Sequence, residues 1–477
     1  MSRSSFQEIL PFVIDNEEFE ESISLQVTSH GSNLENYSPE EETDERSNSG
    51  DLAPLLSNAS REFDSTTPGE SNSVLVLDNG DTLRMPKDGG SFFESFLNMA
   101  NSIIGAGLPF SFRESGIFAG IILLLGLTYL VDWTIRLLVY NAKLSGRNSY
   151  QEVMQFCFGK SGLIIISAFQ LLFAFGGDTL PHVITSLFPN ISNIPVLNLF
   201  TDRYFVIIFC TIFISYPLSL YRDISKLAKA SGLALISMVI IVVAVVIEAP
   251  RVDPRYKGGD KGTWDFVHPE MFQAIGVISF AFVCHHNSLL IFDSLRKPTL
   301  KRFAAVTHLS TGISMLACLL VAIVGYLAFT DKTEGNILNN FPEDNVIINI
   351  ARFCFGFNMF TTLPLEAFVC RESIEIYYFP NASFSLKRHV ILTTIFVMGA
   401  MMVSLLTNDL GIVLELTGGC SATALAYILP PACYLKLSSG NWWSRKKLPA
   451  VICVGFGIAV MILSTVLTLN KMIETKI

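Results

Sequence analysis

Residues 98–112 read NMANSIIGAGLPFSF and mark a change in the character of the chain. Most residues before this stretch are acidic or polar, and most residues after it are apolar. The stretch lies in an apolar segment, yet it contains two Asn, two Gly and one Pro. In a helix interior, Gly costs about 1 kcal/mol and Pro about 3 kcal/mol relative to Ala. The segment is therefore either no membrane span at all or a span whose helix is interrupted.

The composition favours a membrane protein. Half of the 477 residues are hydrophobic, 37 are Phe and only 16% are charged. Several apolar runs reach about 20 residues, the length that crosses a hydrocarbon layer of ~30 Å. A large soluble enzyme with an apolar core would not need runs of this length, so a polytopic membrane protein is the first interpretation.

Charge divides the chain into two regions. Residues 1–91 hold 19 Asp or Glu and 5 Lys or Arg, whereas the remainder holds 23 and 28. The first region is rich in Ser, Glu, Asn and Asp and lacks the apolar residues that would order it. We predict a disordered acidic cytosolic tail over residues 1–91 and a transmembrane domain over residues 92–470.

The apolar runs predict the fold class, an all-α polytopic membrane protein with about eleven transmembrane helices. Windows of about 19 residues define the spans. They lie near residues 92–112, 116–141, 161–187, 204–220, 231–248, 271–293, 304–329, 345–370, 389–407, 410–434 and 449–470.

Lys and Arg predict the orientation of these spans. With the N-terminal tail in the cytosol, the cytosolic side holds 19 of these residues and the opposite side nine. Positive residues accumulate on the cytosolic side, so the N-terminus is expected in the cytosol and the C-terminus in the lumen. The sequon Asn190-Ile-Ser192 then falls in a lumenal loop and is the expected glycosylation site.

The interrupted first span allows two interpretations. One is a helix that packs closely through small residues and kinks at Pro109. The other is a broken helix inside a polar cavity, since irregular backbone at membrane depth survives only there. Freed carbonyls would then hold a cation, and exposed N–H groups would face a carboxylate. A zwitterionic amino acid suits such a site.

The sixth span repeats this feature. It contains Ser279-Phe-Ala-Phe-Val-Cys-His-His-Asn-Ser288, and such a polar cluster is costly in a span unless it faces a cavity or partner helices. A polar contact between helices is the plainer explanation. Interruptions at the first and sixth spans, however, match the inverted 5+5 repeat of secondary transporters, followed here by one extra helix.

Five segments of the apolar region carry a resemblance to known proteins: Asn101–Gly107, Val131–Arg136, Phe280–Leu290, Arg352–Pro364 and Asp409–Gly419. Together they resemble the amino acid/auxin permease family, which includes sodium-coupled neutral amino acid transporters and fungal vacuolar amino acid transporters. The resemblance covers about residues 91–469 and is greatest to the fungal vacuolar members. It implies a LeuT-like fold of the APC superfamily, with repeats over 92–248 and 271–434 and an extra helix over 449–470. It also implies amino-acid transport driven by a proton or sodium gradient.

The resemblance implies roles for individual residues. Asn101 and Thr362 match the positions that hold sodium in the sodium-coupled branch. Among ionisable residues, Glu415 is the leading carboxylate for proton coupling, although a structural ion pair with a base such as Arg352 explains it equally well. His285 and His286 are further proton carriers to consider. The expected substrate-binding residues are Ser102, Ile104, Gly105, Ala106, Gly107, Phe280, His285 and Asn287.

Two ionisable residues need no functional role at this stage. Asp132 and Arg136 are four residues apart on one helical face, so a local ion pair at the cytosolic end of the span accounts for them. No metal-ligand spacing, nucleophile elbow or P-loop points to an enzyme, and no cofactor is expected beyond the coupling ion, H⁺ or Na⁺. The expected partners are lipid and an amino acid. No nucleic-acid partner is expected.

Two departures from the family favour an alternative, a non-transporting amino-acid sensor or scaffold of the same fold. The step from Gly107 to Pro109 is about three residues shorter than usual, which is nearly one helical turn. In the third span, Gly177 joins Asp178 directly where the family has further helical turns. Both departures would weaken a transport path.

The tail contains a candidate sorting signal. Asp51-Leu-Ala-Pro-Leu55-Leu56 fits an acidic dileucine pattern, which adaptor coats read when they direct proteins to vacuoles or lysosomes. An unrecognised turn in the tail is the plainer explanation. We expect a vacuolar or lysosomal membrane, with the plasma membrane or the endoplasmic reticulum and Golgi as alternatives.

Overall fold

The computed structural model describes residues 74–76, 82–84, 92–101, 103, 107–173, 202–221, 230–259, 268, 270–296, 298–379, 382, 384–406, 410–441 and 443–474. The chain separates into two units, Met1–Gly89 and Gly90–Ile477. In the first unit, strands β1 (Val74–Val76) and β2 (Thr82–Arg84) pair antiparallel, with Leu75 opposite Leu83. The predicted disorder of residues 1–91 stays a prediction. The sequence carries Asn79-Gly80 between the two strands, a strong hairpin signal that composition alone overlooks.

The described residues of the second unit form helices only. In the first half these are α3 (Phe92–Asn101), α4 (Leu108–Ser115), α5 (Ile117–Ser145), α6 (Tyr150–Phe173), α8 (Arg203–Cys210), the π-helix η3 (Thr211–Ser215), α9 (Tyr216–Ser219) and α11 (Ala230–Glu248). In the second half they are η4 (Ala249–Arg251), α12 (Met271–Phe282), α13 (His285–Ser294), α14 (Leu300–Phe329), η5 (Thr330–Lys332), η6 (Ile337–Asn340), α15 (Val346–Tyr378), α16 (Leu386–Leu406), α17 (Leu410–Thr417), η7 (Gly418–Ala422), η8 (Ala424–Ile428), α18 (Leu429–Leu437) and α19 (Leu448–Glu474).

The helices support a polytopic membrane fold. Within the described chain, seven helical segments are long and apolar enough to cross a membrane, and Tyr204–Ser219 and Val346–Asn358 are shorter apolar helices. Helices overlap each of the predicted spans, so the all-α class is confirmed for this unit. The number of eleven crossings and the inverted repeat stay predictions.

The third predicted span needs a correction. We placed it at 161–187, but α6 begins at Tyr150, and residues 174–200 lie outside the described residues. The Ser149 hydroxyl accepts a hydrogen bond from the Glu152 N–H at 3.2 Å and caps this earlier start. Gly159 has φ 64° and ψ −150°, so the helix kinks there. Cys157 lies within α6 and is buried.

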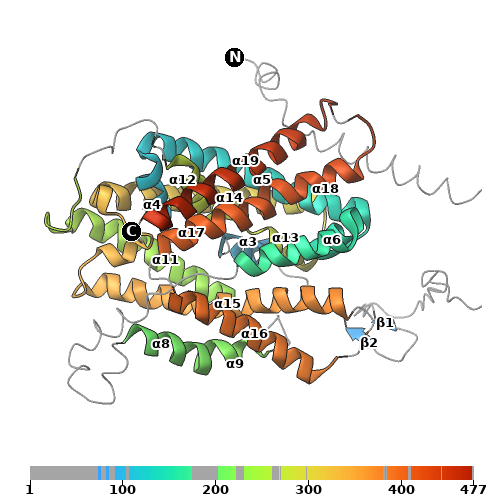
Figure 1. The fold of residues 1–477 in the computed structure, drawn as a ribbon, viewed down its shortest axis with the longest axis horizontal. Helices are drawn as coiled ribbons and strands as arrows, with labels where there is room; N and C mark the ends of the chain where they lie inside the picture. The colour runs from blue at the N-terminus through green and yellow to red at the C-terminus, as the bar shows by residue number, and fades with distance from the viewer. Residues whose placement is uncertain are drawn as a thin grey trace, which may run out of the picture. The chain divides into compact units, whose positions relative to one another are not determined.

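Helix packing places the two interrupted spans beside each other. Helix α14 packs against α3, α4 and α5, while α15 packs against α11 and α16 (Figure 1). On the outward face of α14, Leu309, Ile313, Leu316 and Leu320 are exposed, as a lipid-facing helix requires. The two halves of the first interrupted span, α3 and α4, pack against this helix, and α12 and α13 of the sixth span pack in turn against α4 and α3.

Candidate functional site

The first predicted interruption is present. Helix α3 ends at Asn101, and α4 begins at Leu108, directly after Gly107, with Pro109 in its first turn. Pro is tolerated at this position because the first N–H groups of a helix have no partner inside it. A Cβ on Gly107 would lie 2.5 Å from Leu414 Cδ1, so a larger residue here would displace the end of the Leu414 side chain on α17.

The second interruption lies in the sixth span. Helix α12 ends at Phe282 and α13 begins at His285, with Val283 extended at φ −73° and ψ 107°. A continuous sixth helix is therefore excluded. Helix α3 packs against α13, and α4 packs against α12, so the first half of each span meets the second half of the other.

Buried polar groups surround the second break. The His285 side chain is inaccessible to solvent, and its Nε2 lies 3.0 Å from the Thr134 hydroxyl of α5. His285 Nδ1 and Asn287 Oδ1 have no hydrogen-bond partner among the described residues. An unsatisfied buried polar atom costs about 1–3 kcal/mol. Such atoms beside a helix break are candidates for binding a polar ligand.

Several predicted residues cannot be placed in this site. Phe280 packs against the small apolar cluster of Phe110, Val277 and Leu414, on the α12 side of the break. Ser102, Ile104, Gly105 and Ala106 lie outside the described residues, as do the side chains of Asn101 and Thr362. The sodium site therefore stays a prediction. Asn190, Asp51, Leu55 and Leu56 also lie outside the described residues.

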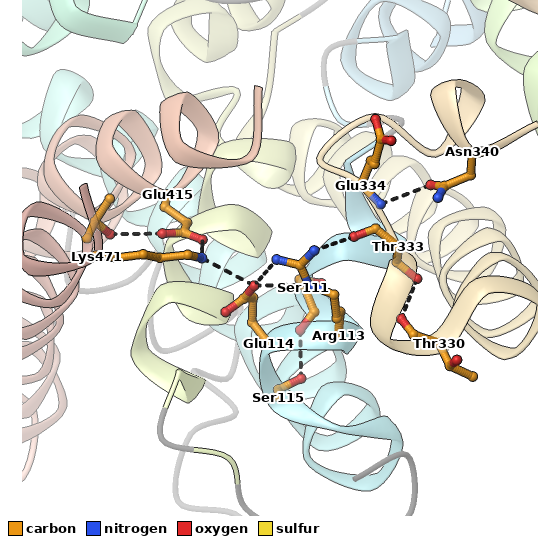
Figure 2. Close-up of polar contacts among 11 residues, drawn as sticks. Ser111, Arg113, Glu114, Ser115, Thr330, Thr333, Glu334, Asn340, Glu415 and Lys471 are labelled. Carbon is orange, nitrogen blue, oxygen red and sulfur yellow. Dashed lines mark hydrogen bonds and ion pairs between the residues drawn. The ribbon is translucent and has the colours of Figure 1, made fainter. Parts of the chain in front are cut away.

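Glu415 is held by a base, but the base is not Arg352. The Glu415 carboxylate is fully buried, and its Oε1 lies 2.8 Å from Lys471 Nζ of α19 (Figure 2). The Thr468 hydroxyl donates to its other oxygen at 3.2 Å. Arg352 instead donates to the Leu338 carbonyl at 2.9 Å. Charge attraction alone could not choose between the bases, because helix packing decides which of them reaches Glu415.

The Lys471 ammonium also reaches α4, the half-helix that follows the first break. Lys471 Nζ lies 3.4 Å from Glu114 Oε1, and Arg113 Nη2 lies 2.7 Å from the same oxygen (Figure 2). Arg113 Nη1 donates to the Thr333 carbonyl at 2.6 Å. We name Arg113, Glu114, Glu415 and Lys471 the Lys471 cluster. It joins α4, α17 and α19 through alternating charges.

A second charged cluster lies on α5 and α14. Asp132 Oδ2 lies 2.9 Å from Arg136 Nη2, so the expected local ion pair is present. Asp132 Oδ1 lies 2.9 Å from His308 Nδ1 of α14. We name these three residues the Asp132 cluster. Sequence reasoning missed His308, although an imidazole inside the seventh predicted span was a signal in itself.

The tenth span contains π-helical turns. Two π-helical turns, η7 and η8, follow α17, and π-turns are rare and frequently lie at functional sites. A Cβ on Gly418 would overlap the Gly276 carbonyl oxygen of α12, so the two backbones touch. A Cβ on Gly276 would lie 3.0 Å from the Glu415 carbonyl oxygen. The element that carries Glu415 is therefore packed directly on the first half of the sixth span.

The chain is similar to known proteins along most of its length. Residues 88–470 match a family described as "Transmembrane amino acid transporter protein". "Vacuolar amino acid transporter 2" of Saccharomyces cerevisiae is 38% identical over 87% of this chain and 92% of its own length. "Putative sodium-coupled neutral amino acid transporter 11" of Danio rerio is 40% identical over 78% of this chain and 84% of its own length. The solved structure of Mhp1, a nucleobase-cation-symport-1 family transporter, matches at a TM-score of 0.47 with 13% identity, over 81% of this chain and 92% of that one.

Proposed function

The chain belongs to the transmembrane amino acid transporter protein family, and on this premise we propose that it is a secondary active transporter of neutral amino acids. The gradient that drives it is one of protons or of sodium. Family membership confirms the resemblance to amino acid/auxin permeases. Because the family consists of transporters, the chain is not an enzyme.

The observation that carries the proposal is the meeting of two interrupted helices. Helix α3 packs on α13 and α4 packs on α12, while His285 Nδ1 and Asn287 Oδ1 are buried without described partners beside the second break. Half-helix ends and free polar atoms of this kind bind zwitterions in transporters built from inverted repeats. The proposal includes the finer fold expected from sequence, which has eleven helices, two inverted repeats of five and one extra helix.

The substrate class follows from the chemistry of the breaks. Backbone N–H groups at a half-helix N-terminus suit a carboxylate, and backbone carbonyls suit an ammonium group. The described polar atoms beside the second break lie on an imidazole and an amide, His285 and Asn287, and not on a carboxylate or ammonium group, which favours a substrate with a neutral side chain. Asn101 and Thr362 are the proposed sodium ligands if the sodium gradient drives transport.

The proposed location is the membrane of a vacuole or lysosome. Its support is the similarity to a yeast vacuolar transporter and the acidic dileucine pattern at Asp51, Leu55 and Leu56. The proposed topology has a cytosolic N-terminus and a lumenal C-terminus, with glycosylation at Asn190. Adaptor coats are the proposed partners of the tail.

Uptake by reconstituted vesicles tests the function. We expect saturable uptake of labelled neutral amino acids that depends on an imposed proton or sodium gradient. Asn101→Ala and Thr362→Ala should abolish uptake without lowering the amount of protein, whereas the neighbouring Thr361→Ala should retain it. Vesicles that take up no amino acid under either gradient would contradict the proposal. Thermal stabilisation by an amino acid without any flux would favour the sensor.

A further inference from the structure

Asp132 is a carboxylate in the middle of a membrane-spanning helix. Helix α5 runs over 29 residues, or about 43 Å at 1.5 Å per residue, so its centre falls inside a ~30 Å hydrocarbon layer. Asp132 lies near the midpoint of this helix and toward the cytosolic end of the predicted span 116–141, and its side chain is only 8% exposed. An ionisable residue within a membrane span is costly, pairs with other polar groups and often marks an ion pathway or a proton relay.

The partners of Asp132 differ in whether they can change charge. Arg136 Nη2 binds Oδ2 at 2.9 Å, and its guanidinium stays charged at any physiological pH. His308 Nδ1 binds Oδ1 at 2.9 Å, and histidine is the side chain that proteins most often use to exchange a proton. The site therefore has one permanent and one switchable cation around a single carboxylate.

Exposure places the imidazole on the accessible side. The His308 side chain is 56% exposed, against 8% for Asp132. In the proposed topology His308 lies four residues inside the predicted span 304–329, near its cytosolic end, so a proton from the cytosol can reach the ring without crossing the buried carboxylate. Other titratable or charged groups near Asp132 are Arg136 on its own helix and the Cys284 thiol at the second break, which interacts electrostatically with Asp132. His285 approaches α5 two residues further along, at Thr134.

The other ionisable candidates suit proton exchange less well. The His285 side chain is fully buried and its Nε2 already contacts the Thr134 hydroxyl. Glu415 is fully buried and paired with Lys471 at 2.8 Å. Neither combines a buried acceptor with an exposed relay, as Asp132 and His308 do.

We propose that Asp132 and His308 form the proton-binding site through which a pH gradient drives this chain, an inference that rests on the proposed function. The site joins α5 of the first proposed repeat to α14 of the second. A proton on His308 adds a full charge to the contact between them, and its release leaves Arg136 as the single permanent cation there. Because α5 also contacts α12 and α13, this change acts directly beside the second break.

Two measurements on reconstituted protein separate coupling from transport. Counterflow exchange of a labelled neutral amino acid, with equal pH on both sides, needs no proton drive. Accumulation against a concentration gradient, under an imposed pH difference, needs it. For His308→Gln, which is never charged, and His308→Arg, which always is, we expect exchange to persist and pH-driven accumulation to be lost. His389→Gln is the control, because that buried imidazole contacts only the Leu220 carbonyl among the hydrogen bonds assigned to its ring in the described chain, and it should keep both activities.

Three outcomes would overturn the inference. Retained pH-driven accumulation in both His308 variants would show that the proton binds elsewhere. Loss of exchange together with accumulation would make the pair a structural contact. A wild-type protein that exchanges amino acids but responds to sodium alone would refute the proton site and leave the transporter function intact. Absence of exchange in the wild type would instead refute the proposed function itself.

Discussion

The Lys471 cluster and the Asp132 cluster are both built from carboxylates and cations, but they differ in the kind of cation. In the first, Lys471 and Arg113 alternate with Glu415 and Glu114. In the second, Asp132 is shared between Arg136 and an imidazole. Lys and Arg keep their charge at physiological pH, whereas an imidazole does not. The first cluster is suited to a permanent tie between helices, and the second to a contact that changes with pH.

The largest effect should follow the loss of the shared cation. Lys471→Met leaves the buried Glu415 and Glu114 carboxylates without their common partner, and breaking a buried pair from one side costs about 3–5 kcal/mol. We expect the free energy of unfolding in detergent to fall by that amount. Adding Glu415→Gln should restore part of the loss, because the amide carries no unpaired charge. Unchanged stability in Lys471→Met would mean that the Lys471 cluster does not hold α4, α17 and α19 together.

A smaller loss is expected in the Asp132 cluster. Arg136→Gln removes a charge-assisted hydrogen bond, which is worth about 1.5–3 kcal/mol, but His308 can still pair with the carboxylate. The same unfolding measurement should show less destabilisation than Lys471→Met. If Arg136→Gln proved the more damaging of the two, the distinction between a permanent and a switchable cluster would fail.

The smallest effect should come from an ordinary helix cap, which sets the baseline. The Thr299 hydroxyl accepts a hydrogen bond from the Arg302 N–H at 3.2 Å at the start of α14, far from the Lys471 cluster. Thr299→Ala should cost about 1 kcal/mol of unfolding free energy. A loss as large as that of Lys471→Met would show that local capping, rather than buried charge, dominates the stability of this fold.

The sequence was sufficient to predict both helix interruptions, because their causes are local. Gly107 and Pro109 in the first span, and the His-His-Asn-Ser run in the sixth, are unfavourable in a plain membrane helix wherever they occur. The spans were predictable for the same reason, since hydropathy is a property of short windows. The start of α6 was missed because Gly159 and Lys160 resemble a loop, although the helix continues through a kink.

The partners of the charged residues were not predictable from sequence. The exception is the Asp132–Arg136 pair, which was predictable because its members are four residues apart on one helix. His308 and Lys471 lie more than 50 residues from the carboxylates they contact, and only tertiary packing brings them there. The same limit explains why Arg352 was a reasonable partner for Glu415 in the sequence and binds backbone carbonyls in the structure.

The glycine contact between α12 and η7 constrains how the molecule can change shape. Gly276 and Gly418 bring two backbones together with no side chain between them. Sliding α12 along η7 would break many close van der Waals contacts at once. Tightly packed interiors therefore switch between discrete arrangements and do not deform continuously. The leading half of the sixth span and the π-helical segment should therefore travel as one rigid body, which leaves the hinge to Val283 and Cys284.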